Sequence, residues 1–205
     1  MPRPTTLNIV LNGTPKSVPV ADGSEPLLFV LRNQLDQIGP KIGCGASQCG
    51  VCTVLVNGSA VRACSVEVNA ISGGAEVLTL DGLADSKPGR TRRLHALQRA
   101  FIDEQAAQCA FCSNGIIMSA LAWLNARGDR GVPSDDEVKR FLSGKGPGAV
   151  SATLCRCGAH LRIVRAIQRA AKDMRHGGFD HGRPEDDDDD GHDDDRGGPF
   201  KGGRP

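Results

Sequence analysis

Large aromatic side chains are scarce in this chain of 205 residues. Aromatic residues make up 3% of the sequence, with one Trp and no Tyr. Because aromatic side chains usually dominate the energetics of a core, their scarcity indicates that something else helps to stabilise the fold. The contents of 39% hydrophobic and 24% charged residues still suit one large globular domain or two small ones. They exclude a collagen and a wholly disordered polymer.

Long apolar runs are missing as well. No stretch approaches the roughly 18 apolar residues of a membrane-spanning helix, and the first residues lack the basic and apolar regions of a secretory signal. We therefore expect a cytoplasmic protein with no direct membrane insertion, unless an exported or membrane-associated partner carries it elsewhere. The net charge is +1, and the basic surplus is too diffuse to indicate binding to nucleic acid.

The C-terminal stretch 177–205 is rich in Gly, Pro and Asp. It holds ten acidic and four basic residues and few apolar ones. Such a composition cannot bury enough apolar surface to offset the entropy of ordering, so a disordered acidic tail is predicted. Binding of a metal or a partner is the alternative to a solvated run of charge.

The first part of the chain alternates apolar and polar residues as β-strands do. Residues 7–11 show this period, and Asn12-Gly13 is a hairpin signal. Pro26 begins a short predicted helix, because its missing N–H costs little at a helix start. Further strands are predicted at 53–56, which ends at a second Asn-Gly turn, and at 77–80.

Beyond about residue 82 the apolar period becomes helical. Four helices are predicted, over 91–105, over 113–126, over a short stretch that begins with capping-box spacing at 134–137, and over 160–174. A boundary therefore falls near 82–90. We expect an α+β protein with a β-rich domain over 5–82 and a helical domain over 83–175.

Eight cysteines fall into two groups of four, one in each expected domain. The first group is Cys44, Cys49, Cys52 and Cys64. The spacing C-x4-C-x2-C with a later Cys is that of a plant-type [2Fe-2S] cluster. Glycines in the loop 43–52 let backbone N–H groups approach sulfur, which stabilises an anionic cluster.

The second group is Cys109, Cys112, Cys155 and Cys157. Each pair precedes a predicted helix, so that N-terminal N–H groups of two helices face the thiolates. The C-x-C pair is awkward for tetrahedral zinc, whose ligand pairs typically have two to four residues between them. Two irons relax that constraint. Structural zinc sites and disulfides are the alternatives, and a reducing cytoplasm works against disulfides.

Three motifs together carry a family resemblance: 41–54 around the first cysteines, 108–115 and 154–158. They resemble the small iron-sulfur subunit of the xanthine oxidase family of molybdenum hydroxylases. The likeness covers roughly residues 5–175 and is closest to the isoquinoline 1-oxidoreductase and nicotinate dehydrogenase types. The order of the two four-Cys patterns makes it specific.

This resemblance implies a fold, cofactors and partners. The fold is a β-grasp ferredoxin-like domain followed by a four-helix [2Fe-2S]-binding domain. Two [2Fe-2S] clusters are implied, and that of Cys109, Cys112, Cys155 and Cys157 lies nearer the molybdenum. Electrons come from a molybdopterin cofactor in a large partner subunit that hydroxylates an N-heteroaromatic or aldehyde substrate. They leave through the cluster of Cys44, Cys49, Cys52 and Cys64 to an acceptor such as cytochrome c, another carrier or a flavin subunit.

Contacts with the pterin are implied for Gln108 and Cys157. No residue of this chain is expected to be catalytic, because substrate chemistry lies in the partner. The chain departs from the usual family residues without losing a cluster ligand, at Ser47, Ala110, Asn114, Thr153 and His160.

The sequence leaves two other functions open. The first is a free-standing electron carrier with two clusters, and the second is an interaction module stapled by zinc. Among other candidates, Trp123 and Phe111 are predicted to be core residues because both lie in apolar helical context. Arg156 is expected either to offset cluster charge, to bind a cofactor phosphate or to be a surface cation.

Overall fold

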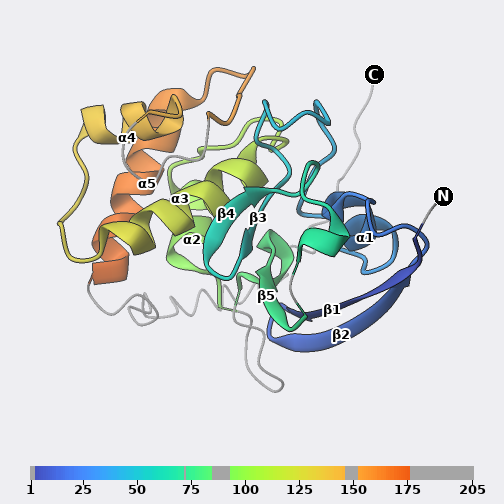
Figure 1. Cartoon of the computed structure of the whole chain (residues 1–205). Coiled ribbons are helices and arrows are strands. Elements are labelled where there is room, and N and C mark those ends of the chain that lie inside the picture. Colours follow the sequence, from blue (N-terminus) through green and yellow to red (C-terminus); the bar gives the residue numbers. More distant parts are fainter. Residues whose placement is uncertain (1–2, 72, 85–92, 146–151, 176–205) are drawn as a thin grey trace, which may run out of the picture.

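A computed structural model describes residues 3–71, 73–84, 93–145 and 152–175. The described part has a mixed α and β fold, in which a five-stranded sheet is followed along the chain by four of the five α-helices (Figure 1). The expected acidic tail at 177–205 lies outside the described residues. The expected domain boundary at 82–90 lies largely outside them too.

The sheet begins with a hairpin that the sequence predicts. Strands β1 (Thr5–Leu11) and β2 (Thr14–Val20) are antiparallel and joined at Asn12 and Gly13, whose φ angles are 50° and 79°. Positive φ at both central positions is the turn that matches the twist of paired strands, and Asn-Gly is the sequence that best adopts it. The hairpin prediction is confirmed.

The strand order is β2-β1-β5-β3-β4. Strand β5 (Ala75–Leu78) lies in the middle, parallel to β1 and antiparallel to β3 (Thr53–Val56). Strand β4 (Ser59–Arg62) pairs with β3 across the second Asn-Gly turn and forms the other edge. Short 3-10 helices occur at Val68–Ala70 and Leu80–Gly82.

One small helix covers the N-terminal part of the sheet. Helix α1 (Leu27–Asn33) begins after Pro26, as predicted, and four of its apolar side chains are fully buried. They share one core with β1, β2 and the buried Cys52 and Cys64. The loop that carries the first cysteines therefore follows a helix that is packed into this core.

Four helices build the second core. They are α2 (Ala96–Asp103), α3 (Ser113–Arg127), α4 (Asp135–Leu142) and α5 (His160–Arg175). Helix α3 buries residues on every side and packs against the sheet through β3 and β4. Trp123 stacks on Phe141 with ring centroids 4.4 Å apart. The core prediction for Trp123 is confirmed, since its side chain is 5% exposed.

Helix starts follow the capping residues. Ser134 accepts a hydrogen bond from the Glu137 N–H, and the Glu137 carboxylate accepts one from the Ser134 N–H, so the predicted capping box is confirmed. The predicted helix over 91–105 is too long. Its regular part begins at Ala96, where the His95 ring accepts from the Leu97 N–H, and ends at Asp103, two residues before the φ of 48° at Gln105.

Helix α3 reaches the sheet through its first turn. The Asn114 amide donates to the carbonyl oxygens of Val51 and Thr53 at 2.8 and 3.0 Å. Next to it, a Cβ built on Gly115 would lie 2.1 Å from the Gly50 carbonyl oxygen. Only a residue without a side chain fits this approach. No helix among the described residues is long and apolar enough to cross a membrane.

Gly115→Ala tests how tightly α3 sits on the cysteine loop. Alanine normally stabilises a helix interior by about 1 kcal/mol relative to glycine. Here the clash is with backbone, so we expect the free energy of unfolding to fall by about 1–3 kcal/mol. Urea unfolding followed by circular dichroism measures it. Gly73→Ala is the control, because a Cβ there meets nothing within 4 Å; a Gly115→Ala protein as stable as the parent would contradict this packing.

Candidate metal centres

The first four cysteines gather at one end of the sheet. Cys44, Cys49 and Cys52 lie on the loop between α1 and β3, and Cys64 follows β4. The loop curls through positive φ angles at Gly45, Ser47 and Gly50. Ser47 adopts this conformation with a φ of 60°, at a position where glycine is the easier residue. We call Cys44, Cys49, Cys52 and Cys64 the N-terminal centre.

Backbone N–H groups surround the outer sulfur of this centre. The Cys44 Sγ accepts from the N–H groups of Ala46, Gln48 and Cys49 at 3.4, 3.3 and 3.3 Å, and the Cys49 Sγ accepts from the Cys44 N–H at 3.4 Å. These donors, Ala46 and Cys49 first, lower the pKa of the exposed Cys44 thiol to about 6. The loop is therefore built to hold negative charge on sulfur.

The inner sulfur of the N-terminal centre is in a different environment. Cys52 is 1% exposed, and burial raises the pKa of its thiol to about 11. A buried thiol gives up its proton when a metal cation takes the proton's place. The combination of an anion-stabilising loop and buried thiols suits metal ligation.

The other four cysteines gather between two helix starts. Cys112 is the N-cap of α3 and Cys109 lies just before it, while Cys155 and Cys157 precede α5. Burial acts to raise the pKa of Cys155, but the Cys112 thiol and the backbone N–H groups at the start of α5 outweigh it and lower the pKa. The predicted placement of both pairs before helices is confirmed. We call Cys109, Cys112, Cys155 and Cys157 the C-terminal centre.

Within each centre the thiols lie in pairs. Cys49 acts on the pKa of Cys44 and Cys64 on that of Cys52, and likewise Cys157 acts on the pKa of Cys109 and Cys155 on that of Cys112. In the described part of the chain, no three His, Cys, Asp or Glu side chains group around a single metal position. Two thiols for each of two metals is the ligand arrangement of a [2Fe-2S] cluster.

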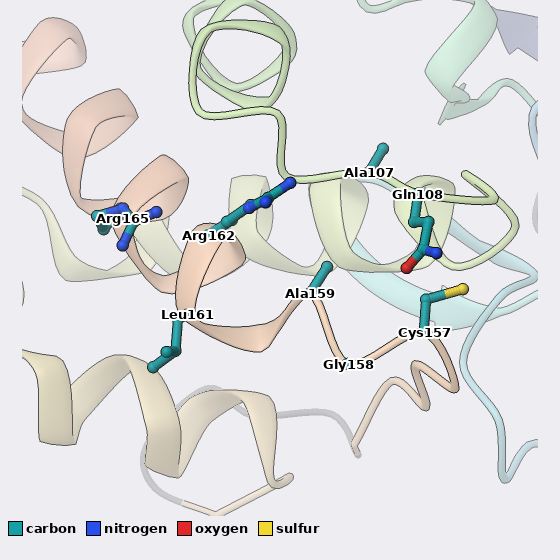
Figure 2. Close-up of a pocket in the computed structure, with 8 residues that line it drawn as sticks. All are labelled: Ala107, Gln108, Cys157, Gly158, Ala159, Leu161, Arg162 and Arg165. Carbon is teal, nitrogen blue, oxygen red and sulfur yellow. The ribbon is translucent and has the colours of Figure 1, made fainter.

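A cavity of about 540 Å³ opens beside the C-terminal centre. Figure 2 shows the Gln108 amide and the Cys157 thiol together at one end and Arg165 at the other. Arg162 and Leu161 complete the wall from α5. The two residues for which the resemblance implies pterin contacts thus line one cavity.

Apolar side chains are exposed around the C-terminal centre. Phe111 is 46% exposed, Leu154 61% and Leu161 69%. The core prediction for Phe111 is therefore wrong, because the residue lies on the turn before α3 and not on its buried face. Arg156 is exposed between Cys155 and Cys157, a position compatible with each of its expected roles.

A backbone hydrogen bond joins the two centres. The Leu154 N–H donates to the Cys49 carbonyl oxygen at 3.0 Å. Arg62, which the sequence patterns do not single out, is 5% exposed and donates to Gly50 and Ala152. The only signal for Arg62 in the sequence is a basic residue that directly follows two apolar residues of a short strand.

Two domain families match the chain. Residues 9–80 match the family described as "2Fe-2S iron-sulfur cluster binding domain", and residues 79–168 match "[2Fe-2S] binding domain". Together they span most of the described residues and contain all eight cysteines.

Full-length relatives agree with these matches. A nicotinate dehydrogenase subunit of Pseudomonas putida is 43% identical over 171 residues, which cover 83% of this chain and 98% of that protein. The alpha subunit of isoquinoline 1-oxidoreductase from Brevundimonas diminuta is 38% identical over 82% of this chain and 98% of its own length.

Solved structures show the same fold. A chain of quinoline 2-oxidoreductase from Pseudomonas putida 86 superposes with a TM-score of 0.71 at 30% identity, over 85% of this chain and 98% of that one. Aldehyde oxidoreductase from Desulfovibrio desulfuricans matches with a TM-score of 0.72 at 32% identity, over 88% of this chain but 19% of the larger one. The chain belongs to the family of small iron-sulfur subunits of the xanthine oxidase type molybdenum hydroxylases, and is part of an oxidoreductase.

Proposed function

We propose that the chain is the electron-transfer subunit of a heteromeric molybdenum hydroxylase. Two [2Fe-2S] clusters carry electrons from the molybdopterin cofactor of a large partner subunit to an external acceptor. The partner hydroxylates an N-heteroaromatic compound or an aldehyde. The observation that carries this proposal is the placement of the eight cysteines in two sets of four, one on the loops around β3 and β4 and one at the starts of α3 and α5.

The ligands follow from that arrangement. Cys44, Cys49, Cys52 and Cys64 would hold one cluster, and Cys109, Cys112, Cys155 and Cys157 the other. In each case two neighbouring thiolates serve each iron, and backbone N–H groups stabilise the net negative charge. When bound, the clusters supply one-electron redox chemistry that the amino acids of this chain lack.

Each of the two ligand sets would lie in a domain of its own. A β-grasp ferredoxin-like domain over 5–82 would carry the N-terminal centre. A four-helix [2Fe-2S]-binding domain over 83–175 would carry the C-terminal centre. The strand order with parallel β1 and β5 and the helices α2 to α5 support this division.

The order of the electron path follows from the surroundings of the C-terminal centre. The cavity lined by Gln108 and Cys157 opens beside it, so we place the molybdenum cofactor and the large subunit on this side. The N-terminal centre, with the exposed Cys44, then faces the acceptor. Gln108 and the thiolate of Cys157 would contact the pterin.

Exposed apolar side chains support a permanent partner at the same face. Phe111, Leu154 and Leu161 surround the C-terminal centre. Large apolar side chains that cluster on a surface mark sites of protein association. A free-standing carrier, the alternative function, has no need of this face.

Metal analysis tests the cluster assignment. We expect about four irons and four acid-labile sulfides per chain and two S = 1/2 EPR signals after reduction with dithionite. Cys49→Ser is expected to abolish one signal and Cys157→Ser the other, each with about half of the iron lost. About two zincs per chain without labile sulfide would overturn the proposal and favour a zinc-stapled interaction module.

Association with a molybdenum-binding subunit tests the assignment to a heteromer. We expect the chain to co-purify with such a subunit, and Leu161→Asp to weaken the association at least tenfold, because it places a charge within an apolar interface. Val132→Asp is the matched control, on an exposed apolar residue beyond the other end of α3. A chain that loads both clusters, purifies alone and is indifferent to Leu161→Asp would instead be a free-standing carrier.

A further inference from the structure

A buried guanidinium lies between the two centres. Arg62 is the last residue of β4 and is 5% exposed. Its guanidinium donates to the Gly50 carbonyl oxygen at 3.0 Å and to the Thr53 hydroxyl. It also donates to the Ala152 carbonyl oxygen at 3.4 Å. It thus joins the loop of the N-terminal centre to the segment that leads into the C-terminal centre.

The guanidinium of Arg62 is tightly packed against Gly50 and Thr153. A Cβ built on Gly50 would lie 2.6 Å from the Thr153 hydroxyl oxygen and 2.7 Å from Nη1 of Arg62. Gly50 has a φ of 78°, which a residue with a side chain adopts only under strain. Packing and backbone conformation together hold the guanidinium in one position.

The charge in this position is costly unless anions compensate it. Burial lowers the pKa of Arg62, and the thiolates of Cys52, Cys49, Cys64 and Cys44 act in the opposite direction. An arginine side chain remains protonated in proteins. The three acceptors named above are neutral, whereas the four thiolates of the N-terminal centre supply negative charge nearby.

We propose that Arg62 is a tuning and positioning residue that raises the reduction potential of the N-terminal cluster and holds the segment 152–154 of the C-terminal centre against it. This inference rests on the proposed function, since it requires a cluster on the four N-terminal thiolates. Reduction adds one electron and one negative charge to that cluster, and breaks or forms no bond. A fixed positive charge stabilises the reduced form more than the oxidised form.

A higher reduction potential of the N-terminal cluster would favour one direction of electron transfer. The electron that the C-terminal cluster gives up is the one that the N-terminal cluster gains. The guanidinium binds Gly50 and Thr53 on either side of Cys52, and the thiolates that act on it all belong to the N-terminal centre, so its charge acts mainly on the receiving cluster. Raising the potential of the receiver favours transfer away from the molybdenum side.

Redox titration of the cluster-loaded protein tests the proposal. Arg62→Gln and Arg62→Met remove the charge, and Arg62→Lys keeps it. The two EPR signals, assigned beforehand with the serine variants, are followed separately, so that the C-terminal cluster is an internal reference. Arg127→Gln is the control for loss of a largely buried arginine, because that side chain pairs with Glu137 near the far end of α3.

We expect both neutral variants to lower the reduced-to-oxidised ratio of the N-terminal cluster at least tenfold at a fixed potential. That change is about 59 mV for a one-electron couple. The C-terminal cluster and the Arg127→Gln protein keep their potentials, and Arg62→Lys recovers at least half of the shift. An unchanged N-terminal potential, or an equal shift of both clusters, would overturn the proposal.

A second pair of variants leaves Arg62 in place. Thr153→Asp puts a carboxylate beside the guanidinium and neutralises its field, whereas Thr153→Asn has the same shape without the charge. The aspartate variant is expected to have the lower N-terminal potential, and equal potentials would contradict the proposal even if the neutral Arg62 variants lose their iron. Iron and sulfide counts on the parent protein separate this failure from a failure of the cluster assignment.

Discussion

The direct contact between the two cysteine loops is the constraint on which the rest of this structure depends. The hydrogen bond from Leu154 to the Cys49 carbonyl oxygen joins the neighbour of one C-terminal thiol to the residue that carries an N-terminal one. On the other side, the first turn of α3 lies on the Gly50 carbonyl through Gly115, and the Asn114 amide binds two carbonyls of the same region. The sheet and the helices are therefore fixed to one another beside the two centres.

Negative charge on sulfur is stabilised mostly by backbone. Three N–H groups point at the Cys44 sulfur, and the starts of α3 and α5 flank the C-terminal thiols. The chain adds one buried cation, Arg62, between the centres. Stabilisation by backbone groups and a single arginine fits the small aromatic content of the chain. Mostly aliphatic side chains build both cores, and cluster binding would add its own free energy to folding.

Local signals in the sequence predicted much of this correctly. Both Asn-Gly turns, the capping box at Ser134 and the helices that follow Cys112 and Cys157 depend on neighbouring residues, which the sequence displays. The helix predicted from 91 fails because its start depends on the His95 ring as a cap, an unusual capping residue. The prediction for Phe111 fails because this residue precedes the first residue of α3 and is not part of the buried face of that helix.

The contacts between the centres could not be predicted in this way. The pairing of thiols, the place of Arg62 and the fit of Gly115 on Gly50 join residues that are far apart in the sequence. Asn114 is the clearest example of a residue whose contacts the sequence does not predict. It is one of the departures from the usual family residues, and only the structure gives it a role, because its side-chain amide donates to the carbonyls of Val51 and Thr53.

Magnetic coupling between the two clusters is the measurement that reports directly on the contact between the two cysteine loops. Two paramagnetic centres held close together in one orientation split each other's EPR lines. We expect unsplit signals when one cluster is reduced and additional, sharply defined splitting when both are. A fully reduced spectrum that equals the sum of the two separate signals would contradict a fixed contact between the loops.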